Sequence, residues 1–190
     1  TWLLKDGTYS VTTGTAVRIN CATTNVNGTA SQPITLKAEN ERQAFISGDG
    51  LTPPFRVDNC AYWIFEGIRV KSADNSAGTV DGSVTSWQTS NNLTIRRMLV
   101  THNNRYLNGS CFWFQNVSNS LAEENEVYSC HRNVFTLGQG QNNTIRRNYI
   151  HSRDYADIAG GYVSAYTSRG DGGFTCYPCS DNIFENNVAE

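Results

Sequence analysis

The segment Ile145-Arg-Arg-Asn148-Tyr-Ile150 decides the fold, because its pattern occurs in five copies along the chain. Each copy has an apolar start, two mostly charged residues, a central residue and an apolar end. The copies start at residues 64, 95, 122, 145 and 183, so the steps between them are 31, 27, 23 and 38 residues. A short strand–turn–strand pattern repeated at this period is typical of a solenoid, and the longer steps predict loops inserted on one side.

The central residue of the repeat predicts a ladder along the stack. It is Asn in three copies, Asn125, Asn148 and Asn186, whereas Gly67 and Met98 occupy the other two. Strands of about three residues are too short for stable hairpins, but stacked coils can pair them in parallel around a continuous core. Identical Asn side chains at one turn can then bond from coil to coil. Glycine suits a bend with positive φ, but Met98 does not fit this pattern.

Each coil is therefore expected to contain three strands. In the fourth coil these are residues 134–137, 143–146 and 149–150, and the equivalent first strands are 111–114 and 162–166. Since no window shows an apolar period of 3.6 residues, we expect little helix. The exceptions are a turn at 120–126 and an irregular segment at 154–161.

Length and charge limit the classes of function. A chain of 190 residues is long enough for one domain with a sizeable core, which we divide into amino-terminal coils at 1–50 and repeated coils at 51–190. The net charge of −2 predicts no nucleic-acid partner, and no apolar stretch has the length of a membrane span. Thr1 opens directly onto a strand-like run and Glu190 stops within a repeat, so we expect both ends to be cuts through a longer polypeptide.

The six cysteines predict disulfides in a secreted, extracellular protein. Cys176 and Cys179 have the spacing of half a zinc site or of a redox pair, but no second pair or His cluster completes a zinc site. Six cysteines allow fifteen pairings, and the repeat register suggests one of them: Cys21–Cys60, Cys111–Cys130 and Cys176–Cys179. Five N-glycosylation motifs agree with this compartment, although such motifs also arise by chance in a chain rich in Asn and Thr; they lie at Asn27, Asn92, Asn108, Asn116 and Asn142.

Three amino-terminal phrases carry a resemblance to a known family: Lys5–Tyr9, Gly28–Glu39 and Ile46–Gly48. They resemble the first coils of the pectin-lyase-like superfamily of right-handed parallel β-helices. Within it they are most similar to the polysaccharide lyases that include alginate lyases and chondroitinase B. The resemblance implies an all-β fold, a single right-handed parallel β-helix. It also implies a secreted protein that binds, and as an enzyme would cleave, acidic polysaccharide containing uronate.

The resemblance implies a lyase mechanism that this sequence does not fully match. These lyases remove the proton beside a uronate carboxyl with a Lys base, while an Arg and usually a calcium ion neutralise the carboxylate. No Lys follows Lys71 in this chain. Either the catalytic coils lie beyond Glu190 or the protein does not perform β-elimination. The alternative function is a non-catalytic structural or adhesive β-helix, such as part of a glycosylated surface fibre that self-assembles through its coil ends.

The loops after the third strands collect residues that bind acidic sugars. All three histidines of the chain fall there, each within three residues of an Arg, and stacking would place them in one row beside the first strands. Arg forks bind carboxylates and His transfers protons near neutral pH. We call this predicted row the His/Arg ridge: His102, Arg105, His131, Arg132, His151, Arg153 and Tyr155. The simpler interpretation is a set of polar, solvent-facing loops.

Two further groups of charged residues have separate interpretations. Asp154, Asp157 and Asp171 could supply oxygen ligands to calcium, the candidate cofactor, although Gly- and Asp-rich loops are more often turns. The Arg pairs at 96–97 and 146–147 occupy equivalent positions of the repeat. We expect them to face Glu123, Glu124 and Glu185 of other coils in a ladder of ion pairs.

Overall fold

The computed structural model describes residues 1–10, 14–73, 75, 77, 83–101, 109–130, 133–151 and 172–189. In this part of the chain the structure is all-β, with three parallel sheets of stacked strands and one short helix, α1 (Cys21–Thr24). Sheet A contains β1 (Trp2–Leu4), β4 (Ile34–Ala38), β7 (Trp63–Glu66), β10 (Thr94–Arg96), β13 (Leu121–Glu123), β16 (Thr144–Arg146) and β19 (Ile183–Glu185).

The other two sheets have the same stacked order. Sheet B contains β2 (Gly7–Ser10), β5 (Ala44–Ser47), β8 (Arg69–Lys71), β11 (Leu99–Thr101), β14 (Glu126–Tyr128), β17 (Tyr149–His151) and β20 (Val188–Ala189). Sheet C contains β3 (Val17–Asn20), β6 (Phe55–Asp58), β9 (Thr85–Gln88), β12 (Ser110–Gln115), β15 (Asn133–Gly138) and β18 (Gly172–Tyr177).

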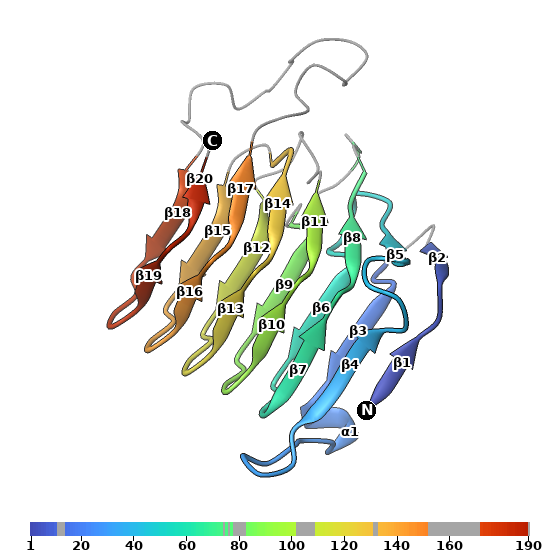
Figure 1. The fold of residues 1–190 in the computed structure, drawn as a ribbon, viewed down its shortest axis with the longest axis horizontal. Helices are drawn as coiled ribbons and strands as arrows, with labels where there is room; N and C mark the ends of the chain where they lie inside the picture. The colour runs from blue at the N-terminus through green and yellow to red at the C-terminus, as the bar shows by residue number, and fades with distance from the viewer. Residues whose placement is uncertain are drawn as a thin grey trace.

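The chain visits sheets A, B and C in turn, and we call one such passage a coil. Figure 1 shows the consequence: the colours run in order from blue to red along the stack, and the two ends of the chain lie at its opposite ends. Every strand pairs in parallel with the equivalent strand of the next coil. The expected all-β architecture of parallel stacked strands is confirmed.

Side chains that point inward from the three sheets form one core. Sheet C supplies large aromatic residues to it, and the rings of Phe112 and Phe135 stack with centroids 4.5 Å apart. Sheet B supplies β-branched residues such as Val70 and Val100, which are fully buried. Each such side chain contributes about 1.5–3 kcal/mol when it leaves water, so stacking the coils is what stabilises these very short strands.

The strand register corrects the alignment of the first and last copies of the repeat by one residue. Phe65, not Ile64, pairs with Ile95, and Phe184, not Ile183, pairs with Ile145. Ile64 pairs with Thr94 in an outward-facing row. Because Ile64 is apolar, it has the same character as the inward-facing residue that starts the other copies of the repeat. Equivalent positions in successive coils are therefore separated by 30, 27, 23 and 39 residues along the sequence.

The corrected register separates two positions that the sequence pattern merged. The bend residue with positive φ is Gly67 in one coil and Arg97, Glu124, Arg147 and Asn186 in the others. The following residue forms the ladder. Asn125 donates from Nδ2 to Asn148 Oδ1 at 2.9 Å, and Asn148 donates to Asn187 Oδ1 at 2.9 Å. The ladder is confirmed for Asn125 and Asn148, whereas the assignment of Asn186 was wrong.

Met98 now has an explanation. It occupies the ladder position, is fully buried, and donates its backbone N–H to Asn125 Oδ1 at 3.0 Å. The Asn ladder therefore ends on an apolar residue that still donates one hydrogen bond to it.

A second polar stack was not anticipated. It runs along the turn between sheets C and A, where Ser120 N–H donates to Asn143 Oδ1 and Asn143 N–H donates to Asn182 Oδ1. Leu93 N–H donates in turn to the Ser120 hydroxyl. Buried backbone N–H groups at the bend between sheets A and B and at the bend between sheets C and A thus donate to side chains.

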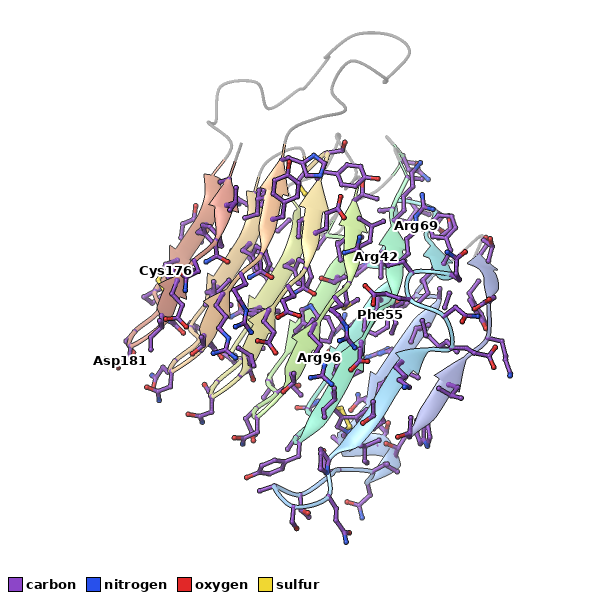
Figure 2. The ribbon with its side chains drawn as sticks, in the orientation of Figure 1. Arg42, Phe55, Arg69, Arg96, Cys176 and Asp181 are labelled. Carbon is purple, nitrogen blue, oxygen red and sulfur yellow. A yellow bond between two sulfur atoms is a disulfide. The ribbon has the colours of Figure 1, made fainter. Side chains whose placement is uncertain are left out.

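Outward-facing charges alternate in sign along sheet A. The row consists of Lys37, Glu66, Arg96, Glu123, Arg146 and Glu185. Figure 2 shows Arg96 on this face of the stack. Arg146 contacts Glu123 at 2.9 Å and Glu185 at 3.9 Å, and Arg147 contacts Glu124 at 3.2 Å. The expected ladder of ion pairs is confirmed, and Glu66, which pairs with Arg96 and Arg97, belongs to it as well.

Three expectations about elements need correction. The strand that follows β15 in sheet C is 172–177, not 162–166, and the latter lies outside the described residues, as does 154–161. Residues 120–126 form strand and tight turn, not a helical turn. The one short helix of the described residues, α1, lies at Cys21–Thr24 instead, where Asn20 caps it by accepting from Ala22 N–H.

The disulfides follow the pairing that the repeat register suggests. Cys21 is bonded to Cys60, Cys111 to Cys130, and Cys176 to Cys179. The first ties α1 to the next coil, and the second joins β12 to the segment that follows β14 in the next coil.

Candidate functional site

The outer face of sheet C carries two arginines in consecutive coils. The register places Arg18 beside Arg56, and Arg56 beside Ser86. Because side chains alternate along a strand, these residues point away from the core to which Val57 and Trp87 belong. The two arginines thus project from neighbouring strands whose backbones are about 4.8 Å apart.

Asp58 holds the two guanidinium groups together. Its carboxylate is nearly buried, with 4% of the side chain exposed. Arg56 Nε donates to both of its oxygens at 2.9 Å, and Arg18 Nε donates to Oδ2 at 3.3 Å. One negative charge therefore orients two positive ones, and this group of three keeps a net charge of +1.

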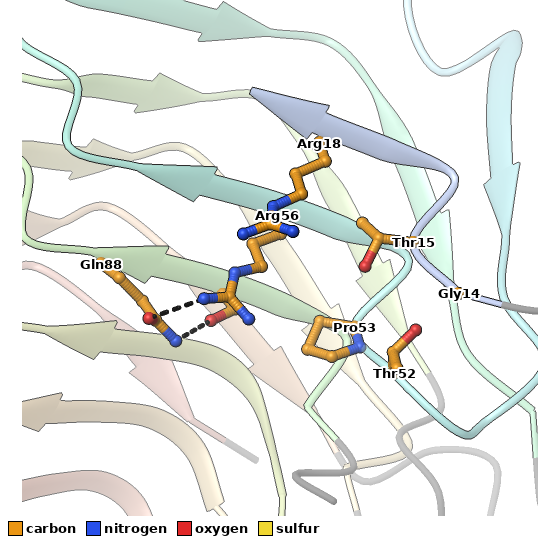
Figure 3. A pocket seen from close by; sticks show the side chains of 8 residues that line it. Gly14, Thr15, Arg18, Thr52, Pro53, Arg56 and Gln88 are labelled. Carbon is orange, nitrogen blue, oxygen red and sulfur yellow. Dashed lines mark hydrogen bonds between the residues drawn. The ribbon is translucent and has the colours of Figure 1, made fainter. Parts of the chain in front are cut away.

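Gln88 fixes the far end of Arg56. Its Oε1 accepts from Arg56 Nη2 at 3.0 Å, while its Nε2 donates to the Ser86 hydroxyl at 3.0 Å (Figure 3). With Nε and Nη2 both bonded, the guanidinium plane of Arg56 is fixed before any ligand arrives. Such fixed donors bind at a lower entropic cost than mobile ones.

These residues border a cavity of about 410 Å³, which we call the Arg18–Arg56 pocket. The loop before β3 contributes Thr15, and the loop before β6 contributes Thr52 and Pro53. Figure 3 shows both guanidinium groups on one side of the pocket and Thr15 and Pro53 on the other. The eight lining residues include two guanidinium groups and no carboxylate.

The pocket is rich in unused hydrogen-bond donors. Within the described residues, no hydrogen bond uses Arg18 Nη1, Arg18 Nη2 or Arg56 Nη1. Arg18 is also the more open of the two, with 55% of its side chain exposed, against 32% for Arg56. Planar, donor-rich guanidinium forks match carboxylate and sulfate groups. The pocket can therefore hold an anionic group that has two or more oxygens.

The sequence interpretation missed this site, although a signal exists. The segments Val17-Arg-Ile-Asn20 and Phe55-Arg-Val-Asp58 share an apolar–Arg–apolar–polar pattern. An Arg between two core residues of a strand must face outward. Two matching segments are a weaker signal than the five-copy repeat at 64–188, which lies at the turns.

Of the predicted His/Arg ridge, the structure describes His151. It lies in register with Thr101 and Tyr128, so its equivalents in those coils are not histidines. Only 7% of the His151 side chain is exposed, and its ring stacks on Tyr128 at 4.8 Å and lies 4.7 Å from Tyr149.

The His151 ring is also bonded to a carboxylate. Its Nε2 lies 3.2 Å from Glu126 Oε1, and Arg42 Nη1 donates to Glu126 Oε2 at 2.6 Å. Figure 2 shows Arg42 between the first coils and the middle of the stack, from where it reaches this carboxylate. The contacts make His151 a packed residue at the end of β17.

The remaining residues of the predicted ridge and calcium site lie outside the described part of the chain: His102, Arg105, His131, Arg132, Arg153, Asp154, Tyr155, Asp157 and Asp171. Among the residues that are described, no group of three His, Cys, Asp or Glu side chains is placed to hold a metal ion.

Four of the five glycosylation motifs can be located, and Asn108 lies outside the described residues. Asn92, Asn116 and Asn142 sit at the bends between sheets C and A with φ of 52°, 54° and 56°. Asn27 accepts from Ala61 N–H at 2.7 Å. Asn tolerates the left-handed conformation better than most residues, so the bends explain why Asn is frequent there. Glycosylation stays a prediction.

Comparisons with known proteins add no identification. No family model matches the chain, and neither the curated proteins nor the solved structures contain a match. No helix among the described residues is long and apolar enough to span a membrane.

Proposed function

We propose that this protein is a secreted, right-handed parallel β-helix that binds acidic polysaccharide on the outer face of sheet C. The observation that carries the proposal is the Arg18–Arg56 pocket, with its two oriented guanidinium groups and no lining carboxylate. Uronate carboxylates and sulfate esters are the anionic groups of such polymers, and both suit guanidinium forks.

The architecture supports the same proposal. Three parallel sheets visited in turn are the expected arrangement of a parallel β-helix, and stacked coils give a long, straight face on which a polymer can lie. Three disulfides fit an oxidising compartment outside the cell. Binding is the function that these residues support.

The test is the variant Arg18→Ala. Arg56 still pairs with Asp58 in this variant, so the buried carboxylate keeps a partner and folding should be preserved. We expect affinity for alginate, pectate or chondroitin sulfate to fall roughly ten- to a hundredfold, because hydrogen bonds to charged groups are lost. Titration calorimetry at low salt measures the change.

A matched control separates the pocket from general charge. Arg147→Ala removes the same charge from sheet A, where the side chain is 48% exposed and pairs with Glu123 and Glu124. Its affinity should stay near that of the wild type, and Arg18→Lys should recover only part of the loss. If Arg18→Ala and Arg147→Ala lose the same affinity for the polymer, the protein attracts the polymer only non-specifically, through its positive charges.

The second candidate is a non-catalytic structural or adhesive β-helix. The observation that favours it is the extent of the lengthwise ladders, since the Asn stack and the charge row of sheet A both serve coil stacking. A wild-type protein that binds none of the three acidic polymers would favour this candidate over the first.

A further inference from the structure

The outward row that contains Arg18 and Arg56 continues into an aromatic residue. Ser86 pairs with Trp113 in the next coil, so the row runs Arg18, Arg56, Ser86, Trp113. Phe112 and Phe114 on either side belong to the core, which directs Trp113 to the outer face. Trp113 therefore stands two coils from Arg56, roughly 10 Å along the stack.

Trp113 differs from the other tryptophans in the middle of the stack. Trp63 and Trp87 are 1% and 0% exposed, and both indole N–H groups donate within the fold, to Val26 O and to the Thr85 hydroxyl. Trp113 is partly exposed, and within the described residues its indole N–H has no hydrogen-bond partner. An aromatic face beside a free donor can hold a sugar ring together with one of its hydroxyls.

The residue between the two features is covered by its neighbours. Ser86 is fully buried, and its hydroxyl accepts a hydrogen bond from Gln88 Nε2 at 3.0 Å. A ligand that reaches from Arg56 to Trp113 therefore passes over side chains such as Gln88. The pocket and the indole thus lie in one row parallel to the stacking axis, which we call the track, with the buried Ser86 between them.

We infer that Trp113 is a second sugar subsite, and that the bound polymer runs along the stack from the Arg18–Arg56 pocket to Trp113. The ligand class is an acidic oligosaccharide with an anionic group in the pocket and a ring stacked on the indole further along. This inference rests on the proposed function and adds to it the direction of the chain and a minimum ligand length.

The experiment compares short and long ligands. A uronate disaccharide reaches the pocket alone, whereas a hexasaccharide spans both contacts. In Trp113→Ala we expect the hexasaccharide affinity to fall about threefold to tenfold and the disaccharide affinity to stay unchanged. Trp113→Phe, which keeps a ring, should recover most of the hexasaccharide affinity. Circular dichroism checks that each variant keeps its fold.

Fluorescence gives an independent readout. Trp63 and Trp87 are buried, and Trp2, although 51% exposed, lies in sheet A away from the outer face of sheet C, so a hexasaccharide-dependent change of emission should come from Trp113. It should be absent in Trp113→Phe and absent with the disaccharide.

The possible failures are distinguishable. Equal affinity of Trp113→Ala and wild type for the hexasaccharide, with Arg18→Ala still weakened, would overturn the track and leave the proposed function standing. Equal losses for both ligands in Trp113→Ala would also overturn it, because the indole would then act on the pocket itself. Absence of wild-type binding to either ligand would overturn the proposed function and the track together.

Discussion

At the scale of single residues, the position after each bend decides whether the coils stay in register. Asn148 Oδ1 accepts both the backbone N–H and the side-chain Nδ2 of Asn125, at 3.0 and 2.9 Å. Its own Nδ2 donates to Ala122 O at 3.1 Å. All of these groups are buried, so no water can replace a lost partner. The ladder is thus a requirement of the buried backbone at the turn.

Truncating this residue tests the ladder. Asn148→Ala leaves two buried donors of Asn125 without an acceptor, at a cost of about 1–3 kcal/mol each, so we expect the free energy of unfolding to fall by about 2–5 kcal/mol. Met98→Leu at the equivalent position keeps the backbone donor and should cost less than about 1.5 kcal/mol. Urea denaturation measures both, and similar losses would mean that the ladder contributes only packing.

At the scale of elements, sheet A stabilises its outer face by alternating charge. Burial opposes ionisation of Glu66, but the hydrogen bonds and charges of Arg96 and Arg97 outweigh it and hold the pKa of Glu66 below its ordinary value. A single exposed pair of this kind contributes little, whereas here each carboxylate serves arginines in a row and only 14% of the Glu66 side chain is exposed.

This shift predicts a pH dependence. Because the pKa of Glu66 is lower in the folded protein, its contribution to stability is fully present above the unfolded-state pKa of about 4.3 and is lost as the pH falls through the folded-state value. Between about pH 5 and pH 3 we expect the free energy of unfolding to fall more steeply in the wild type than in Glu66→Gln. Parallel curves in denaturant titrations would show that the ion pair is not formed.

At the scale of the whole molecule, binding and cleavage can be separated. The residues that line the Arg18–Arg56 pocket include no Lys, the residue that the resemblance implies as the base of β-elimination. We therefore expect the chain to retain alginate, pectate and chondroitin sulfate without forming the unsaturated product of β-elimination. Absorbance of that product during incubation with calcium checks this, and its appearance would contradict the expectation.

The sequence alone determined the class of architecture. Apolar residues recur in short alternating runs, and the five-copy repeat at 64–188 requires equivalent residues to stack. Those two facts predict parallel coils, the Asn125–Asn148 ladder and the inter-coil ion pairs, because each depends only on which residues are equivalent. The pairing of Cys21 with Cys60 follows from the same register.

Only the tertiary structure decided the exact register and the location of the pocket. A shift of one residue, as at Ile64 and Phe65, exchanges inside for outside, and both residues are apolar, so composition cannot choose between them. Arg18 and Arg56 are 38 residues apart and meet because two loops of unequal length return the chain to sheet C. Proximity across coils depends on loop closure and packing, which no local pattern of residues records.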